Sequence, residues 1–232
     1  SEDSVEIGLA SLGYIVFSAD YVGYGSSLGQ SHPYLLKQPS ADVVLDLLQA
    51  GKKLLQESNI ETTSQLFMTG YSQGGYVTMA ALKELQENPR EGLLATGVVL
   101  GAGPYDVNTT LDVLTRGINV PNIFEGLVID YIMDRLVPSN EITFESTILQ
   151  RFFDEDRQDD VHNWRPDIAI KLFHGEDDRT VPIESAVSTF NVMKNLGADI
   201  ELIRCSASPS NHRNCILPYV EYMLSYFDGL RS

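Results

Sequence analysis

The sequence predicts an α/β fold in which a mostly parallel sheet carries helices on both faces. Short runs rich in β-branched residues alternate with longer segments of helical period, and this alternation is typical of βαβ units. The chain has 232 residues, of which 43% are hydrophobic and 21% charged, so it is long enough and apolar enough to bury one core. One interruption, between residues 104 and 164, is too long for a single crossover connection.

Five short runs of apolar and β-branched residues have the length of buried strands. Because helical or loop segments separate each run from the next, the strands are expected to lie mostly parallel in one sheet. In chain order they are Tyr14–Ala19, Gln65–Thr69, Thr96–Leu100, Ile168–Phe173 and Asp199–Arg204.

Segments with apolar residues at helical spacing follow most of these runs. The first helix is expected to be capped by Ser40, whose side-chain oxygen can accept a free backbone N–H. Its apolar positions are Val44, Leu47, Leu48, Leu54 and Leu55. The other expected helices are Gly74–Asn88, which ends before a proline, Ile183–Asn195 and Ile216–Phe227.

The interruption is interpreted as a helical cap over residues 104–164, inserted into a core formed by residues 1–103 and 165–232. Within the cap, Pro121 can begin a helix. The apolar side chains that share one face of this helix are Phe124, Leu127, Val128, Tyr131 and Ile132. The side chains of Phe124, Leu127, Val128 and Tyr131 are expected to form one wall of a substrate pocket. The alternative is an ordinary longer helical excursion whose apolar face packs on the sheet.

The composition argues against several kinds of partner. The chain carries a formal net charge of -16 with a pI near 4.5, so the phosphate backbone of a nucleic acid would be repelled. No run approaches the roughly 20 consecutive apolar residues that a membrane-spanning helix needs, so integral membrane association is not expected. The acidic run at residues 154–160 is interpreted as a solvated loop in preference to a calcium site.

The two cysteines of the chain, Cys205 and Cys215, are predicted to form a disulfide. The closed loop would contain His212 and hold it in register. Disulfides form in oxidising compartments, so this pairing favours a secreted or periplasmic location. The alternative is a pair of unrelated free thiols.

A serine motif lies between a predicted strand and a predicted helix. The pentapeptide GYSQG at residues 70–74 fits the pattern G-x-S-x-G, which places the serine on a sharp turn with its hydroxyl exposed. Ser72 is therefore the predicted nucleophile. The backbone N–H of Gln73, at the start of the helix, is the expected oxyanion donor, and Tyr71 is expected beside the substrate. The alternative is a chance glycine-rich turn.

A serine nucleophile needs a base, and the base needs an acid to orient it. His212 is the predicted base, because it follows the last strand and comes after every candidate acid in the chain. Physical reasoning alone leaves four candidate acids, all of which follow strands: Asp106, Glu176, Asp177 and Asp178.

The other three histidines receive different interpretations. His32 follows the first predicted strand and is expected to line the substrate pocket. His162 lies among polar and charged residues and is expected to be solvated. His174 ends a predicted strand and is expected to have a structural role in a turn.

These motifs together resemble a known group of enzymes. The segments GYSQGG at 70–75 and HGEDDRTVP at 174–182, with a late histidine, resemble esterases and lipases of the α/β-hydrolase superfamily. The segment DYVGYGSS at 20–27, followed by HPYL at 32–35, is similar to secreted bacterial lipases and esterases related to the fungal secretory lipases. The resemblance implies hydrolysis of a small-molecule or lipid ester through an acyl-enzyme intermediate, with no metal or organic cofactor.

The resemblance also implies roles for particular residues. In the HG-x-x-D pattern of the superfamily the acid is the fourth residue after the histidine, which is Asp178 here. Three strands and a loop that donates the second oxyanion N–H normally precede the strand placed at Tyr14–Ala19. Nothing upstream of Ser11 can supply that donor, so the N-terminal strands of the fold are expected to be missing. A further N-terminal segment of the same polypeptide is expected to be needed for full activity.

Two other functions fit the same residues. A peptidase or amidase would use the same catalytic groups, because specificity lies in the pocket. A non-catalytic binding protein on this fold would typically lack one of the three catalytic residues, and none is lacking here.

Overall fold

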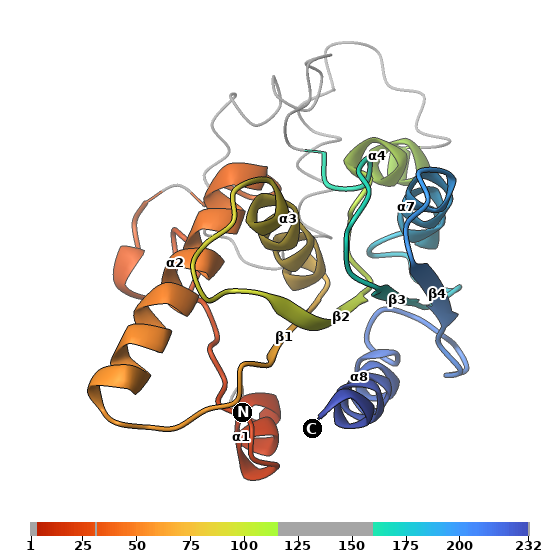
Figure 1. The fold of residues 1–232 in the computed structure, drawn as a ribbon. Helices are drawn as coiled ribbons and strands as arrows, with labels where there is room; N and C mark the ends of the chain where they lie inside the picture. Colours follow the sequence, from red (N-terminus) through yellow and green to blue (C-terminus); the bar gives the residue numbers. More distant parts are fainter. Residues whose placement is uncertain (1–3, 31, 116–159, 232) are drawn as a thin grey trace.

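The described residues, 4–30, 32–115 and 160–231 of a computed structural model, form a three-layer α/β arrangement (Figure 1). Its centre is a sheet of four strands in the order β1-β2-β3-β4, and all neighbouring strands are parallel. The strands are β1 (Leu66–Tyr71), β2 (Ala95–Gly101), β3 (Ile170–His174) and β4 (Ile200–Arg204). The predicted α/β class with a parallel sheet is confirmed.

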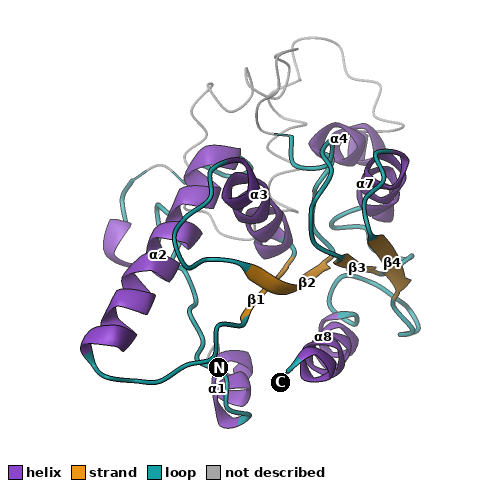
Figure 2. Ribbon diagram, in the orientation of Figure 1, coloured by secondary structure: helices purple, strands orange, loops and turns teal. Residues whose placement is uncertain are grey.

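Helices cover both faces of this sheet, as predicted (Figures 1 and 2). Those on one face are α2 (Lys37–Glu57), α3 (Gln73–Glu87), α4 (Val107–Thr115) and α7 (Ile183–Asn195). On the other face lie α1 (Ser4–Ser11) and α8 (Ile216–Leu230). A short 3-10 helix, η1, spans Gly25–Ser27. None of the described helices is long and apolar enough to cross a membrane.

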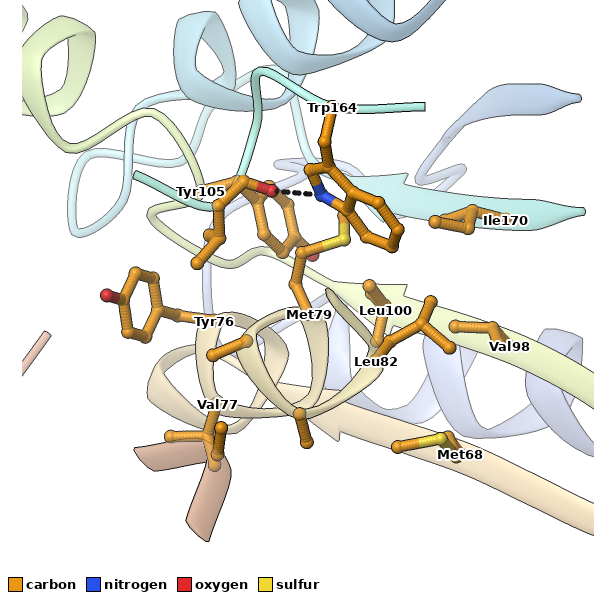
Figure 3. Packing of buried hydrophobic residues seen from close by; sticks show 14 of the residues in the cluster. Met68, Tyr76, Val77, Met79, Leu82, Val98, Leu100, Tyr105, Trp164 and Ile170 are labelled. Atoms are coloured by element: carbon orange, nitrogen blue, oxygen red, sulfur yellow. Dashed lines mark hydrogen bonds between the residues drawn. The ribbon is translucent and has the colours of Figure 1, made fainter. Parts of the chain in front are cut away.

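The alternation of side chains along β2 divides the core between the two layers. Val98 and Leu100 are fully buried on the side of α3, whereas Val99 between them is fully buried on the side of α8. Figure 3 shows the first of these clusters, in which strand residues pack against the inner face of α3. A strand with apolar residues on both faces is what a parallel sheet covered by helices requires.

The segment Tyr14–Ala19 is not a strand, which corrects the prediction. It bridges the layers as a strand would, because Tyr14 packs edge-on against Phe67 and Phe17 packs against α2 at Gly51. A strand, however, is defined by a ladder of hydrogen bonds to a neighbour. Among the described residues no strand pairs with this segment, and β1 pairs only with β2. The apolar pattern overestimated burial as well as pairing, because Tyr14, Val16, Phe17 and Ala19 are only partly buried and Ile15 is 48% exposed.

The start of α2 also differs from the prediction. The helix begins at Lys37 and its N-cap is Leu36, so Ser40 is buried within the first turn and does not cap it. A proline at position 39 is compatible with this start, because the first helical N–H groups have no partner inside the helix. The buried stripe of α2 runs through Ala41, Leu45 and Leu48, whereas Leu54, one of the apolar positions of the predicted helix, is exposed. The other predicted strands and helices of the core lie where they were expected, with small shifts at their ends, whereas α1, η1 and the bounds of α4 were not predicted.

The predicted cap lies largely outside the described residues. Only its beginning and its end are described, and there α4 packs against α7. The proposed pocket wall formed by Phe124, Leu127, Val128 and Tyr131 falls in the segment 116–159, of which the structure describes nothing. The division of the chain at residues 104 and 164 therefore stays a prediction.

Candidate active site

The register of the sheet brings the ends of the strands to one edge. Tyr71 at the end of β1 is level with Gly101 of β2, which is level with Phe173 of β3. His174 at the end of β3 is level with Arg204, the last residue of β4. In open parallel sheets this carboxyl edge is where ligands bind. The loops that follow the four strands carry Ser72, Asp106, the 175–178 segment and His212.

Ser72 occupies the sharp turn that its motif predicts. It has φ 58° and ψ -125°, a left-handed conformation that is strained for a residue with a side chain. The turn brings β1 and α3 so close that a Cβ on Gly70 would lie 2.1 Å from the carbonyl oxygen of Gly74. Only glycine fits there. The backbone N–H of Ser72 donates to Gly101 O at 2.8 Å, which fastens the turn to β2.

The helix that follows presents free donors beside Ser72. Ser72 is the N-cap of α3, and Gln73 is its first residue. The backbone N–H of Gln73 forms no hydrogen bond with the described part of the chain. Unpaired N–H groups and the positive end of the helix dipole attract negative charge at this position. The arrangement fits an oxyanion donor.

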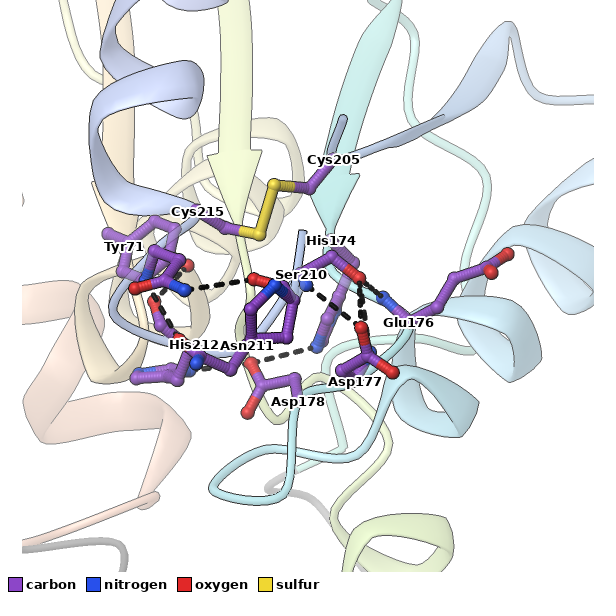
Figure 4. The surroundings of a disulfide bond; sticks show 12 residues. Tyr71, His174, Glu176, Asp177, Asp178, Cys205, Ser210, Asn211, His212 and Cys215 are labelled. Carbon is purple, nitrogen blue, oxygen red and sulfur yellow. Dashed lines mark hydrogen bonds and ion pairs between the residues drawn. A yellow bond between two sulfur atoms is a disulfide. The ribbon is translucent and has the colours of Figure 1, made fainter. Parts of the chain in front are cut away.

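His212 and Asp178 form a short hydrogen bond. Nδ1 of His212 lies 2.6 Å from Oδ2 of Asp178, and the Asp178 side chain is fully buried (Figure 4). The other carboxylate oxygen accepts the backbone N–H groups of Thr180 and Val181 at 2.9 and 3.0 Å. Because the carboxylate accepts a hydrogen bond from Nδ1–H, Nε2 of His212 carries no proton and is left free to act as a base.

The electrostatics keep Asp178 ionised. Burial raises its pKa, but hydrogen bonds from His174 and His212 outweigh burial and lower the pKa of Asp178 to about 2. Of the four candidate acids, Asp178 is the one that the structure pairs with His212.

Asp177 has a different partner from its neighbour. It is exposed, and its Oδ2 accepts hydrogen bonds from the backbone N–H and the hydroxyl of Ser210 at 2.9 and 3.1 Å. The backbone N–H groups of Glu176 and Asp177 in turn donate to the Ser210 hydroxyl. Asp177 therefore ties the acid-bearing loop to the histidine-bearing loop. Ser210 was missed in the sequence, and no local pattern marks it.

The loop that carries His212 is held at three points. Cys205 and Cys215 form the predicted disulfide, with their Cα atoms 5.9 Å apart. The hydroxyl of Tyr71 donates to the backbone carbonyl of His212 at 2.7 Å, and the two rings pack with their centroids 5.2 Å apart. Ser210 supplies the third point. Tyr71, expected beside the substrate, thus contacts His212 through both its hydroxyl and its ring.

Tyr71 links the serine turn to the histidine loop, because it precedes Ser72 in the chain and contacts His212. The Ser72 hydroxyl itself makes no hydrogen bond with any described residue. In free enzymes such contacts are often long and tighten only when substrate binds.

His32 lies beside the serine turn. Its Nδ1 is 2.7 Å from the carbonyl oxygen of Val22, and its Nε2 is 2.6 Å from the side-chain nitrogen of Gln73. The ring is buried among Tyr21, Tyr24 and Tyr34. Burial lowers the pKa of His32, so the neutral ring donates from Nδ1 and accepts at Nε2. Both nitrogens are occupied by protein groups, which fits an anchor for Gln73 better than a surface for substrate.

Asp106 and His162 form a separate cluster. The Asp106 carboxylate is buried and accepts hydrogen bonds from Thr109 and Ser188. His162, expected to be solvated, is instead half-buried between two carboxylates, with Nδ1 2.6 Å from Asp160 and Nε2 3.6 Å from Asp106. Burial alone would lower the pKa of His162, but the two aspartates outweigh it and raise the pKa.

This cluster has the residue types of a metal site. Its ligand atoms all lie within 4.8 Å of one another, and in the described ranges no other such group occurs. Both imidazole nitrogens, however, face carboxylates as donors, so a protonated His162 supplies the positive charge that the aspartates require.

The sequence and the fold agree with one family. The family model described as secretory lipase matches residues 2–131, which is more than half of the chain. The chain belongs to the secretory lipase family. No curated protein sequence matches it. Membership in this family makes the chain an ester hydrolase.

Solved structures show the fold in members of several hydrolase groups. An esterase LipA from Xanthomonas oryzae, described as rice cell wall degrading, has a TM-score of 0.72 and 21% identity over 96% of this chain and 74% of its own. Lipase A from Candida antarctica has a TM-score of 0.55 and 16% identity over 86% and 56%. An acylaminoacyl peptidase from Pyrococcus horikoshii reaches 0.51 and 16% over 84% and 28%. This secretory lipase family member therefore has the α/β-hydrolase fold.

Proposed function

We propose that the chain is a serine carboxylic ester hydrolase that works through an acyl-enzyme intermediate. The observation that carries the proposal is the 2.6 Å hydrogen bond between His212 and the buried Asp178, beside a serine in the strained turn of its motif. This pairing leaves Nε2 of His212 free to serve as a base at the carboxyl edge of the sheet, where Ser72 also lies. The order serine, acid, histidine is that of the superfamily.

In the proposed first step, Ser72 Oγ attacks the ester carbonyl while Nε2 of His212 takes its proton. Asp178 holds the imidazole in the tautomer with its proton on Nδ1 and stabilises the imidazolium that forms. The free backbone N–H of Gln73 donates to the oxyanion of the tetrahedral intermediate. His212 then gives the proton to the leaving alcohol, and a water molecule, activated in the same way, hydrolyses the acyl-enzyme.

The substrate is proposed to be a lipid or small-molecule ester. Support comes from the family and from the net charge of -16, which disfavours strongly anionic substrates. Residues 124–131 are still proposed to form an apolar wall for the acyl group. We propose that the protein is exported, since the family is one of secretory lipases and the Cys205–Cys215 disulfide suits an oxidising compartment.

A comparison of ester and amide substrates tests the proposal. The wild-type protein should hydrolyse p-nitrophenyl butyrate far faster than aminoacyl anilides of similar size. The Ser72→Ala variant should lose the esterase activity, whereas the control Ser64→Ala, at an exposed serine outside the site, should keep it. Faster cleavage of the anilides would favour a peptidase, the activity named for one relative of the fold.

A further inference from the structure

His174 is the most deeply buried histidine of the described residues. It is the last residue of β3, and its side chain has no exposed surface. Its ring points toward the carboxylate of Asp178 (Figure 4). The sequence pattern predicts only a structural role in the turn for this residue.

The surroundings of His174 favour one tautomer of its ring. Its Nε2 lies 2.8 Å from the carbonyl oxygen of Val181 and 3.5 Å from Oδ2 of Asp178. Its Nδ1 is buried and has no hydrogen-bond partner. A proton on Nδ1 would be a buried donor without an acceptor, which is costly, so the geometry favours the tautomer with the proton on Nε2. That N–H donates to the carbonyl oxygen of Val181, and the same nitrogen faces the carboxylate over the longer distance.

Four N–H groups therefore surround the carboxylate of Asp178. Oδ1 accepts the two backbone N–H groups of Thr180 and Val181. Oδ2 accepts Nδ1–H of His212 and faces Nε2–H of His174. The side chains of His174 and Asp178 both have no exposed surface, so this contact is shielded from solvent. His174 also anchors Val181, so one ring holds both the acid and the loop that presents it.

We propose that His174 is a positioning residue for the reaction, acting through Asp178. Its Nε2–H fixes Oδ2 in the place where that oxygen meets Nδ1 of His212. The inference rests on the proposed function, because it requires Asp178 to be the orienting acid. Hydrogen bonds to the ionised form, including that from His174, lower the pKa of Asp178 against the effect of burial, which agrees with this role.

Two substitutions separate the donor from the bulk of the ring. His174→Met fills the space without a donor, and kcat for an ester should fall about 10- to 100-fold, as expected for the loss of one hydrogen bond to a charged group. KM should change little, because the substrate does not touch this residue. His174→Gln places an amide N–H near the position of Nε2 and should restore most of the lost kcat. Thermal unfolding verifies that both variants are folded.

A double-mutant cycle distinguishes positioning from a merely structural role. If His174 acts through the carboxylate, His174→Met should have no further effect in the Asp178→Asn background. The readout is the rate at which a fluorophosphonate labels Ser72, which is measurable in slow variants. If His174→Met does not fold, His174→Asn replaces it in the same cycle, since its shorter side chain cannot reach Oδ2.

Different results of these experiments would overturn the positioning role of His174 and the assignment of Asp178 as the acid. Equal losses from the substitution at His174 in both backgrounds, or a folded His174→Gln as slow as His174→Met, would overturn the positioning role. If Asp178→Asn alone leaves the labelling rate unchanged, the proposed function loses its acid instead. The failure of the inference and that of the proposed function are thus distinguishable.

Discussion

At the scale of single residues, two adjacent aspartates have different tasks because their side chains leave the loop in different directions. Asp178 is buried and points to His212, whereas Asp177 is exposed and points to Ser210. Both carboxylates accept hydrogen bonds from backbone N–H groups, but only the first is paired with a histidine. The two positions therefore form a matched pair for mutation.

Asp178→Asn should reduce kcat far more than Asp177→Asn. An amide at position 178 cannot favour the required tautomer of His212 or stabilise the imidazolium, a loss of about 10⁴-fold in the protease triad where it has been measured. Asp177→Asn should lower thermal stability slightly and leave kcat within a few-fold. Steady-state kinetics on one ester substrate measure kcat for both variants and the wild-type protein. A larger loss at position 177 would refute the assignment of the acid.

The proposed catalytic residues were largely predictable, whereas their supports were not. The serine motif and the chain order predict Ser72 and His212, whereas Asp178 was selected from four candidate acids only by the resemblance to the superfamily. The contacts of His32 with Gln73 and of Ser210 with Asp177 join residues more than thirty positions apart. No local period or spacing encodes such contacts, so only the folded chain reveals them.

At the scale of elements, the Cys205–Cys215 disulfide closes the loop between β4 and α8, which carries His212. The disulfide joins the end of β4 to the residue that precedes α8, and both sulfur-bearing residues are buried. A Cβ on Gly175 would lie 1.9 Å from the carbonyl oxygen of Ser210, so the acid-bearing loop and this loop are in close contact. Displacement of one loop would disturb the other.

Replacement of both cysteines by serine should lower the free energy of unfolding and should also lower kcat for ester hydrolysis. A closed loop of this size stabilises by roughly 3 kcal/mol, largely by restricting the unfolded chain. We also expect a lower kcat, because His212 lies inside the loop and loses one of its anchors. Denaturant unfolding and ester hydrolysis measure the two effects. Unchanged values for both in the double variant would show that the remaining anchors suffice.

The elements also show where pattern reasoning succeeds and fails. β2 was predicted well because burial on both faces gives a continuous apolar run. The segment Tyr14–Ala19 has a similar apolar pattern, yet it is only partly buried and lacks a paired neighbour among the described strands. A short apolar run therefore predicts neither the burial of a segment nor its pairing, because both depend on what lies alongside.

At the scale of the whole molecule, two buried clusters give opposite dependences of stability on pH. The pKa of Asp178 is lowered to about 2, so its contribution is present above its unfolded value and is lost as the pH falls towards about 2. The pKa of His162 is raised, so its contribution is present below about 6.5 and is lost as the pH rises through the folded pKa.

The pH dependence that arises from His162 can be tested at its cluster with Asp106 and Asp160. His162→Gln should lower the free energy of unfolding more at about pH 5.5 than at about pH 9, since only the protonated ring pairs with both Asp106 and Asp160. Urea unfolding of both proteins at each pH supplies the comparison. A larger effect at the higher pH would contradict the raised pKa. Ester hydrolysis should change little, because His162 has no contact with His212 or Asp178.

The central claim is that Ser72 is a nucleophile activated by His212. The most direct measurement is intact and peptide mass spectrometry after treatment with a fluorophosphonate, with His212→Gln as the matched variant. If Ser72 is the nucleophile, the wild-type protein should carry one adduct, mapped to the peptide that contains Ser72, and His212→Gln should be labelled at a greatly reduced rate. An adduct on another residue, or equally fast labelling of both proteins, would contradict the claim.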